Sequence, residues 1–161
     1  MPKVMDGKMK IELKPIGYIS SEFQNPKDLR FACEKGLLAK TESKLNIRDE
    51  FLTGLKGLEK FSHLWVIYSL HKANRIELKT YPGPPSVKNL PRAGVFATRS
   101  QYRPNHIALR LVQIKKIEKN VIEVSGLDAI DGSPVIDIKP YVSHFDRLEK
   151  FKEADWYKWN P

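Results

Sequence analysis

The fold class follows from residues 107–138, which read IALRLVQIKKIEKNVIEVSGLDAIDGSPVIDI. Apolar and β-branched residues recur through 107–117 and again through 121–127, and Lys119-Asn120 separates the two runs. Such runs are typical of strands, so we predict two strands joined by a short turn. The dipeptide Asp131-Gly132 is typical of tight hairpin turns. It predicts a second hairpin, with arms at 121–130 and 134–138.

Further strands are predicted towards the N-terminus. Residues 63–71, HLWVIYSLH, form a nearly continuous apolar run, as in a buried strand. Residues 81–91 contain YPGPP and must form a loop. Three weaker patterns also indicate strands, at 10–20, 45–51 and 94–98. Many short strands with few helices predict a mainly β, single-domain fold, a closed or nearly closed β-barrel with short helical additions.

Helical signals are few. Residues 32–39 fit either a short helix or a loop, and residues 144–154 predict a terminal helix. Four apolar residues fall at helical spacing, although nearby glycines weaken the pattern: Phe51, Leu55, Leu58 and Phe61. We expect the aromatic tail to pack on the barrel, with base stacking as the alternative. The tail consists of Trp156, Tyr157 and Trp159.

Length and composition indicate one ordinary domain. The chain has 161 residues, of which 41% are hydrophobic, enough to bury a core without covalent staples. Cys33 is the only cysteine, which excludes an internal disulfide and a multi-cysteine zinc site and fits a reducing compartment. Residues 1–10 lack the apolar region of a signal peptide, and no stretch is long enough to span a bilayer. A cytoplasmic protein is therefore expected.

The chain is strongly basic. Lys and Arg number 28 against 19 Asp and Glu, which gives a formal net charge of +9. A polyanionic partner would account for this surplus, and so would a lysine-rich surface with no such partner. One basic cluster provides either an RNA-binding surface or a solvated face: Arg110, Lys115, Lys116 and Lys119.

Three stretches are specific in composition and order. The first is FSHLW at 61–65, leading to His71. The second is GVFATRS at 94–100, leading to Arg103-Pro104-Asn105, and the third is GLDAIDGSPVIDIKPY at 126–141. Together with IGYI at 16–19, they resemble the TsaA-like (TrmO) family over about residues 13–142.

This resemblance implies a β-barrel methyltransferase that uses S-adenosyl-L-methionine (SAM) and works as a homodimer. The implied substrate is N6-threonylcarbamoyl-adenosine, just 3′ of the anticodon in certain tRNAs, and the product carries an added methyl group on N6. The implied partners are therefore a tRNA anticodon stem-loop and a second copy of the chain. No strand–glycine loop–helix dinucleotide fingerprint is present, so the SAM site is not expected to be of the Rossmann type.

The resemblance also implies site residues, where the motifs match. The expected SAM contacts are His71, Lys72, Arg99, Leu109, Ser125, Gly126, Leu127 and Asp128. Arg103 and Asn105 are expected to contact the substrate. The guanidinium groups of Arg99 and Arg103 are suited to clamp a carboxylate or phosphate. Asp128 and His71 are the two candidates for the proton acceptor. No metal site is expected.

Some positions depart from the family pattern, namely Ala32-Cys33-Glu34, Lys72, His106 and Ala108. They motivate two alternatives, a SAM- or RNA-binding module without catalysis and a methyltransferase for a different substrate. Individual residues also have structural alternatives: His71 as a strand cap, and Arg99 as an ion-pair partner of Asp128 or Asp137. Asp131 fits a purely structural turn role. His63, within an apolar run, is predicted to be structural.

Overall fold

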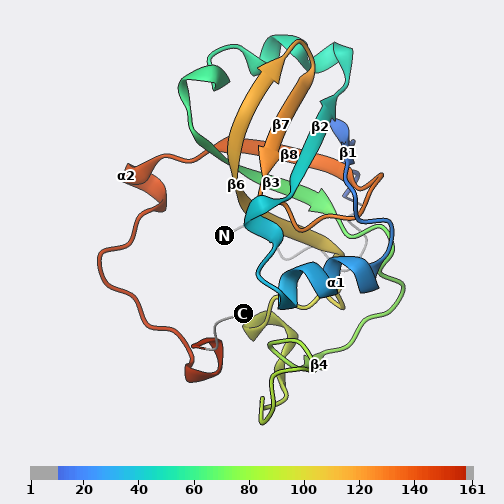
Figure 1. The fold of residues 1–161 in the computed structure, drawn as a ribbon, viewed down its shortest axis with the longest axis vertical. Coiled ribbons are helices and arrows are strands. Elements are labelled where there is room, and N and C mark those ends of the chain that lie inside the picture. Colours follow the sequence, from blue (N-terminus) through green and yellow to red (C-terminus); the bar gives the residue numbers. More distant parts are fainter. Residues whose placement is uncertain (1–10, 159–161) are drawn as a thin grey trace, which may run out of the picture.

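A computed structural model describes residues 11–158. Its strands form a closed antiparallel barrel in the order β1-β2-β7-β6-β3-β8 (Figure 1). The strands are β1 (Gly17–Ser20), β2 (Glu42–Ile47), β3 (His63–Ser69), β6 (Ile107–Glu118), β7 (Val121–Ser125) and β8 (Pro134–Pro140). The predicted mainly β barrel is therefore confirmed. Among residues 11–158, no helix is long and apolar enough to cross a membrane.

The hairpin β6–β7 is confirmed, and the predicted second hairpin is wrong. Lys119 adopts a positive φ of 52° in the first turn. β8 pairs with β1 and β3 instead of β7, because both edges of β7 are occupied by β2 and β6. The Asp131-Gly132 turn lies against β1 and the residues after it: the amide of Asp131 donates to the carbonyl of Phe23, and that of Gly132 to Ile19.

The barrel interior is filled from alternate positions of the strands. In β3, Leu64, Val66 and Tyr68 are buried, and the intervening residues are only partly so. Leu45 and Ile122 from facing strands are also fully buried. Each such aliphatic side chain stabilises the fold by about 1.5–3 kcal/mol relative to exposure. This core holds the ends of β3 and β7 in place, and the candidate site begins there.

Gly17 lies where β1 approaches β2 too closely for a side chain. A Cβ added there would lie 2.3 Å from the carbonyl oxygen of Asn46. We expect Gly17→Ala to lower the free energy of unfolding by about 1–3 kcal/mol, since the strand backbones must separate. Chemical denaturation measures this change. Gly54→Ala is the matched control, because a Cβ there meets nothing within 4 Å; equal effects of the two substitutions would contradict the prediction.

The helix at the N-terminal side begins earlier than the sequence indicated. α1 spans Pro26–Glu34, and the side chain of Asn25 caps it by accepting hydrogen bonds from the amides of Lys27 and Asp28. The Asn-Pro pair is thus a helix start, with Pro26 in the first turn. A separate 3-10 turn, η1, covers Leu38–Lys40. The predicted segment 32–39 therefore divides between the end of α1, a loop and η1.

Several other predicted boundaries are corrected. The helical spacing from Phe51 to Phe61 becomes two 3-10 helices, η2 (Asp49–Leu55) and η3 (Leu58–Lys60), because Gly57 between them has a φ of 93°. The strand expected at 45–51 is β2, which ends at Ile47. The strand expected at 10–20 is β1, which begins at Gly17, and residue 10 lies outside the described residues.

Residues 94–98 do not form a barrel strand. Of these residues only Gly94 belongs to a strand, β5 (Ala93–Gly94), which pairs with β4 (Lys79–Thr80) and closes the predicted loop 81–91. Val95–Ala97 is a 3-10 turn, η4, in which the amide of Thr98 donates to the carbonyl of Val95 at 3.2 Å and the Thr98 hydroxyl donates to the same carbonyl at 2.9 Å.

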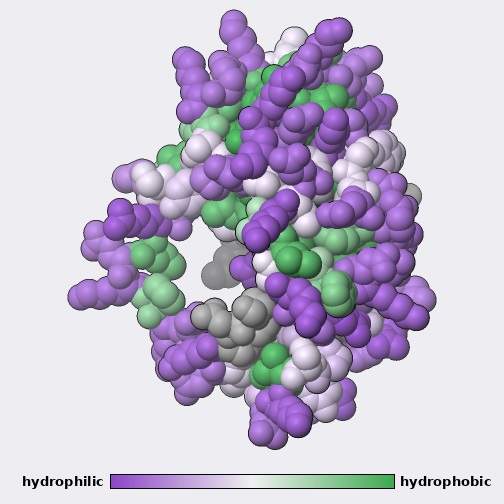
Figure 2. All heavy atoms as spheres, in the orientation of Figure 1, coloured by the Kyte–Doolittle hydropathy of each residue, from purple (hydrophilic) through white to green (hydrophobic). Residues whose placement is uncertain are grey.

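The predicted terminal helix 144–154 is also wrong. α2 covers only Ser143–Asp146, and the chain then runs without regular structure to η5 (Asp155–Tyr157). This segment bends away from the barrel (Figure 1). Figure 2 shows apolar side chains on it. Phe145, Leu148 and Phe151 have the spacing of a helix face but are 70–79% exposed. These side chains are not packed against the described residues, and most helical stability in proteins comes from such packing.

Candidate functional site

Two adjoining cavities open where α1 faces the end of β3. The first measures about 460 Å³ and is lined by residues of α1, by the end of β3 and by the 126–133 segment. The second measures about 480 Å³ and lies towards η4 and the start of β6. Both share several lining residues, namely Leu29, Tyr68, Leu70, Arg99, Gln101, Arg110 and Asp128. We treat them as one continuous site.

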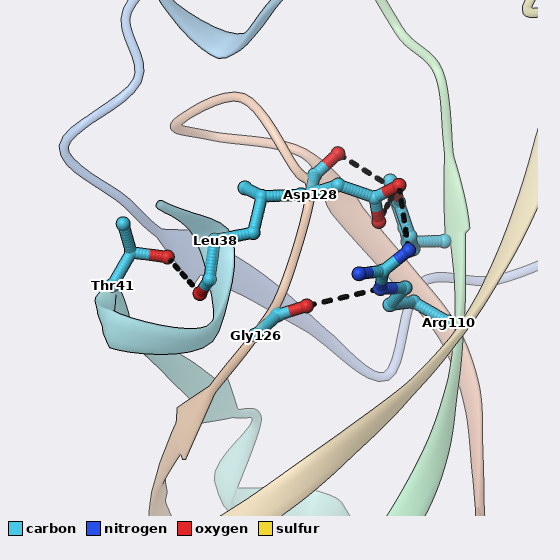
Figure 3. A network of polar contacts seen from close by, with 6 residues as sticks. Leu38, Thr41, Arg110, Gly126 and Asp128 are labelled. Carbon is cyan, nitrogen blue, oxygen red and sulfur yellow. Dashed lines mark hydrogen bonds and ion pairs between the residues drawn. The ribbon is translucent and has the colours of Figure 1, made fainter. Parts of the chain in front are cut away.

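Asp128 is fixed at the centre of this site. The hydroxyl of Tyr68 lies 2.9 Å from the carbonyl oxygen of Asp128 and 3.0 Å from its Oδ1, to which it donates. Arg110 donates from Nε to the carbonyl of Gly126 at 3.0 Å, and its Nη1 lies 3.8 Å from Oδ2 of Asp128 (Figure 3). Burial, followed by the charge of Asp128, raises the pKa of Tyr68 well above its usual value. Tyr68 is therefore a neutral donor at all physiological pH values.

His71 presents a defined tautomer at the cavity rim. Its Nδ1 lies 3.1 Å from Oγ of Ser133, and that hydroxyl donates its only proton to the carbonyl of Ile130 at 2.6 Å. Nδ1 must therefore carry the hydrogen and donate, which leaves Nε2 with a free lone pair. Partial burial, followed by the charge of Lys72, lowers the pKa of His71 below its usual 6.5. The ring is neutral at pH 7.

Lys72 and Cys33 also line the first cavity, near His71. Lys72 donates to the carbonyl of Gln24 at 2.7 Å. Burial, followed by the charge of Asp128, raises the pKa of the Cys33 thiol to about 11. The thiol is thus protonated and a poor nucleophile. A covalent role for Cys33 has no support in this geometry.

Arg99 extends from the loop after η4 into both cavities. The proposed alternative, an ion pair with Asp128 or Asp137, is wrong: Asp128 is paired with Arg110, and Asp137 with Lys139 at 2.7 Å. The backbone amide of Arg99 donates to the hydroxyl of Tyr157 at 3.2 Å. Tyr157 of the aromatic tail therefore contacts the loop that carries Arg99, and packing of the tail on the barrel strands stays a prediction, while Trp159 lies outside the described residues.

Some expected contact residues do not line either cavity. Ser125 and Leu127 are buried in the barrel, and Gly126 contributes a carbonyl that holds Arg110. Asn105 also lies away from both cavities. The remaining predicted residues do line the site: His71, Lys72, Arg99, Leu109, Asp128 and Arg103. Arg103 is additionally committed to the fold, because it donates to the carbonyls of Val95 and Thr98.

Sequence reasoning missed Tyr68 and misplaced Arg110. Tyr68 follows Leu64 and Val66 on the inward face of β3, and Arg110 faces Val66 across the β3–β6 ladder. A charged residue at an inward position of a barrel strand is a signal that was available. Lys116 belongs to a different environment, an exposed ion pair with Glu118. The four-residue basic cluster is therefore not one surface.

His63 and the possible metal ligands are the remaining groups considered in the sequence. His63 is half-buried and its Nδ1 lies 2.9 Å from Oγ of Ser62, consistent with a structural role. Among residues 11–158, no group of three His, Cys, Asp or Glu side chains is arranged to hold a metal ion.

A closed β-barrel whose end carries a cavity lined by apolar and charged side chains defines a barrel with a candidate ligand-binding site, outside the dinucleotide-binding folds. The chain belongs to the tRNA-methyltransferase O N-terminal domain family, whose model matches residues 18–147. The resemblance drawn from the sequence motifs is therefore confirmed.

Relatives carry names consistent with this family. A probable S-adenosyl-L-methionine-binding protein of Methanothermobacter thermautotrophicus is 41% identical over 140 residues, covering 87% of this chain and 96% of that protein. The tRNA (adenine(37)-N6)-methyltransferase of Mus musculus is 38% identical over 137 residues, covering 83% of this chain and 31% of the mouse protein. The crystal structure of TrmO from Pseudomonas aeruginosa superposes with a TM-score of 0.71 at 31% identity, covering 91% of this chain and 63% of that one.

Thus the chain spans nearly all of the archaeal relative, under two thirds of the solved structure and about a third of the mouse enzyme.

Proposed function

We propose that this chain is a SAM-dependent methyltransferase that adds a methyl group to N6 of threonylcarbamoyl-adenosine next to the anticodon of tRNA. The observation that carries the proposal is the convergence of His71, Arg99 and Asp128 on one cavity. These residues come from three separate motifs, and each lies in or after a different strand region. The relatives named for tRNA adenine-37 N6 methylation and for SAM binding support the same reaction.

The cavity fits SAM in size and chemistry. Its volume of about 460 Å³ falls within the range of about 300–1,000 Å³ that is usual for small-molecule sites. Apolar side chains, including Leu29, Leu38 and Leu70, can cover an adenine ring, while Asp128 and Glu34 offer carboxylates to an ammonium group. Arg99 offers a guanidinium to a carboxylate. When bound, SAM supplies an electrophilic methyl group on a sulfonium.

The side chains act by positioning and by accepting a proton. Methyl transfer is an in-line displacement, so no nucleophilic side chain is needed and alignment of the acceptor nitrogen contributes most. The acceptor nitrogen must lose a proton, and Nε2 of His71 is a neutral, unoccupied base at the cavity rim. Asp128 is engaged by Tyr68 and Arg110, so we assign it to binding and not to proton transfer.

We also propose a homodimer that works in the cytoplasm. Phe145, Leu148 and Phe151 stand exposed on the segment that bends away from the barrel, and Phe96 and Leu109 are exposed at the rim of the second cavity. A second copy of the chain would bury these side chains and enclose the site. The tRNA substrate and a free thiol at Cys33 both fit a reducing, cytoplasmic compartment.

Replacing Leu148 tests the dimer. We expect Leu148→Asp to shift the protein from dimer to monomer, because a carboxylate would lose its hydration in an apolar interface. Sedimentation velocity measures the mass of each species. Lys150→Asp introduces the same residue in the same segment at another exposed position and should remain a dimer. A monomeric wild-type protein at micromolar concentration would refute this part of the proposal.

The reaction is tested by incubating the protein with SAM and tRNA that carries N6-threonylcarbamoyl-adenosine. Nuclease digestion followed by mass spectrometry of the nucleosides should show a gain of one methyl group on the modified adenosine. Calorimetry with SAM alone measures cofactor binding separately. SAM binding without any methylated product would favour the non-catalytic module over the enzyme.

A further inference from the structure

A third cavity of about 720 Å³ lies beside the first and is not used by the proposed reaction. It is formed by the loop between β4 and β5, in the region labelled β4 in Figure 1, and by residues 99–102. Arg30, Pro84, Arg99 and Gln101 line both this cavity and the first one. A polymeric ligand that extends out of the first cavity on this side would therefore enter the third cavity, which we call the hairpin cleft.

The charge of the hairpin cleft is strongly positive. Its lining includes five cationic side chains: Arg30, Arg75, Lys79, Arg92 and Arg99. The single carboxylate is Glu77, which is held by Arg75 at 2.8 Å. The cleft therefore favours a polyanion, and the phosphates of a nucleic acid strand supply that charge.

Two tyrosines in the hairpin cleft differ in how accessible their rings are to a ligand. The guanidinium of Arg75 lies over the ring of Tyr102 at 4.3 Å from its centroid, so that face is occupied. Tyr81 is 59% exposed, and Arg92 lies further away, at 6.0 Å from its centroid. Arg92 also donates to the carbonyl of Lys79, which fixes the guanidinium beside the ring. Arg92 thus lies over one face of the Tyr81 ring, and the exposure of the residue leaves the ring accessible for stacking.

The walls of the hairpin cleft are fixed to each other. The hydroxyls of Thr80 and Thr98 share a buried hydrogen bond at 3.0 Å, which ties β4 to the turn that carries Arg99. The amide of Val95 donates to the carbonyl of Leu78, and the amide of Glu77 donates to the carbonyl of Tyr102. A preformed cleft loses little conformational entropy when a ligand binds.

We propose that the hairpin cleft binds the RNA nucleotide adjacent to the methyl acceptor. Tyr81 stacks on the base of that nucleotide, and Arg92 and Arg30 hold its phosphates. This assignment rests on the proposed function, because it takes the RNA strand to continue out of the first cavity. Unstacked bases of a loop are the usual targets of such aromatic and cationic pairs in RNA recognition.

Binding of an unmodified RNA hairpin with an anticodon-loop sequence tests the cleft. We expect Tyr81→Ala to weaken binding about 10-fold, within the range reported for loss of one stacked base, and Tyr81→Phe to bind as the wild type does. Arg92→Gln should lower the slope of log affinity against log salt by about one. Neither residue lines the first cavity, so the SAM affinity of each variant should stay unchanged. Lys60→Gln, an exposed site in η3, is the control for charge loss.

The outcomes separate this inference from the proposed reaction. If Tyr81→Ala and Arg92→Gln bind the hairpin as tightly as Lys60→Gln does, the assignment of the hairpin cleft is overturned, whatever the enzyme does to tRNA. If binding depends on Tyr81 and no methyl group is transferred, the proposed reaction is refuted and with it the position next to a methyl acceptor, while RNA binding by the hairpin cleft is retained. Thermal melting of the variants confirms that each is folded.

Discussion

We expect His71→Ala to lower the rate of methyl transfer by about 10²–10⁴-fold, the range usual for loss of a general base. The expectation rests on the hydrogen-bond chain from His71 Nδ1 to Ser133 and on to Ile130, which leaves Nε2 free. Single-turnover methylation with saturating SAM and tRNA measures the chemical step directly. The SAM dissociation constant, measured by calorimetry, should rise far less than the rate falls.

The pH profile distinguishes a base from a residue that only binds. The pKa of His71 is lowered below 6.5, so the active neutral form predominates at pH 7 and above. The wild-type rate should therefore fall as the pH drops through that lowered pKa, and the acidic limb should be missing in His71→Ala. His63→Gln, at the start of the strand that precedes His71, is the control and should keep the decline at acidic pH. If the rate of His71→Ala falls at acidic pH as the wild-type rate does, another group accepts the proton.

Local patterns in the sequence predicted the strands whose own run of apolar residues is enough to indicate burial. β3 shows this, because its apolar run needs no knowledge of its neighbours. The pairing of β8 was not predictable in this way. Asp131-Gly132 has the composition of a hairpin turn, but β7 already has a partner on each edge, and that is a property of the closed barrel. The predicted helix at 144–154 is wrong for the opposite reason, since its apolar side chains Phe145, Leu148 and Phe151 are not packed against the described residues.

The sequence predicted the site residues that lie in or next to the family motifs. It missed those that reach the site only because two barrel strands pair in a particular register. His71, Arg99 and Asp128 lie in or next to motif stretches and line one cavity, while their roles stay predictions. Tyr68 and Arg110 occupy inward positions of β3 and β6, and only the register between those strands brings both to Asp128. Ser125 and Leu127 lie in the expected segment but are buried: Ser125 breaks the alternation of β7 at its last position, and Leu127 follows the strand and packs in the core.

We expect Asp128→Ala to weaken SAM binding by about 10- to 100-fold, since hydrogen bonds to a charged group contribute about 1.5–3 kcal/mol each. The carboxylate is held on both sides, by Tyr68 at 3.0 Å and by Arg110 at 3.8 Å, and therefore needs little reorganisation to meet a ligand. Calorimetry with SAM measures the loss. The hydroxyl of Tyr68 keeps the carbonyl of residue 128 as an acceptor, so the fold should persist.

Asp137→Ala is the matched control for this change. Asp137 is also a barrel aspartate in an ion pair, with Lys139, but it lines neither of the two cavities that form the site. Its removal should leave the SAM dissociation constant unchanged, because an exposed pair of this kind contributes little even to stability. Equal losses in both variants would indicate a general effect of negative charge on the barrel. A loss confined to Asp128→Ala indicates direct contact, because of these two carboxylates only Asp128 lines the cavity shared by His71 and Arg99.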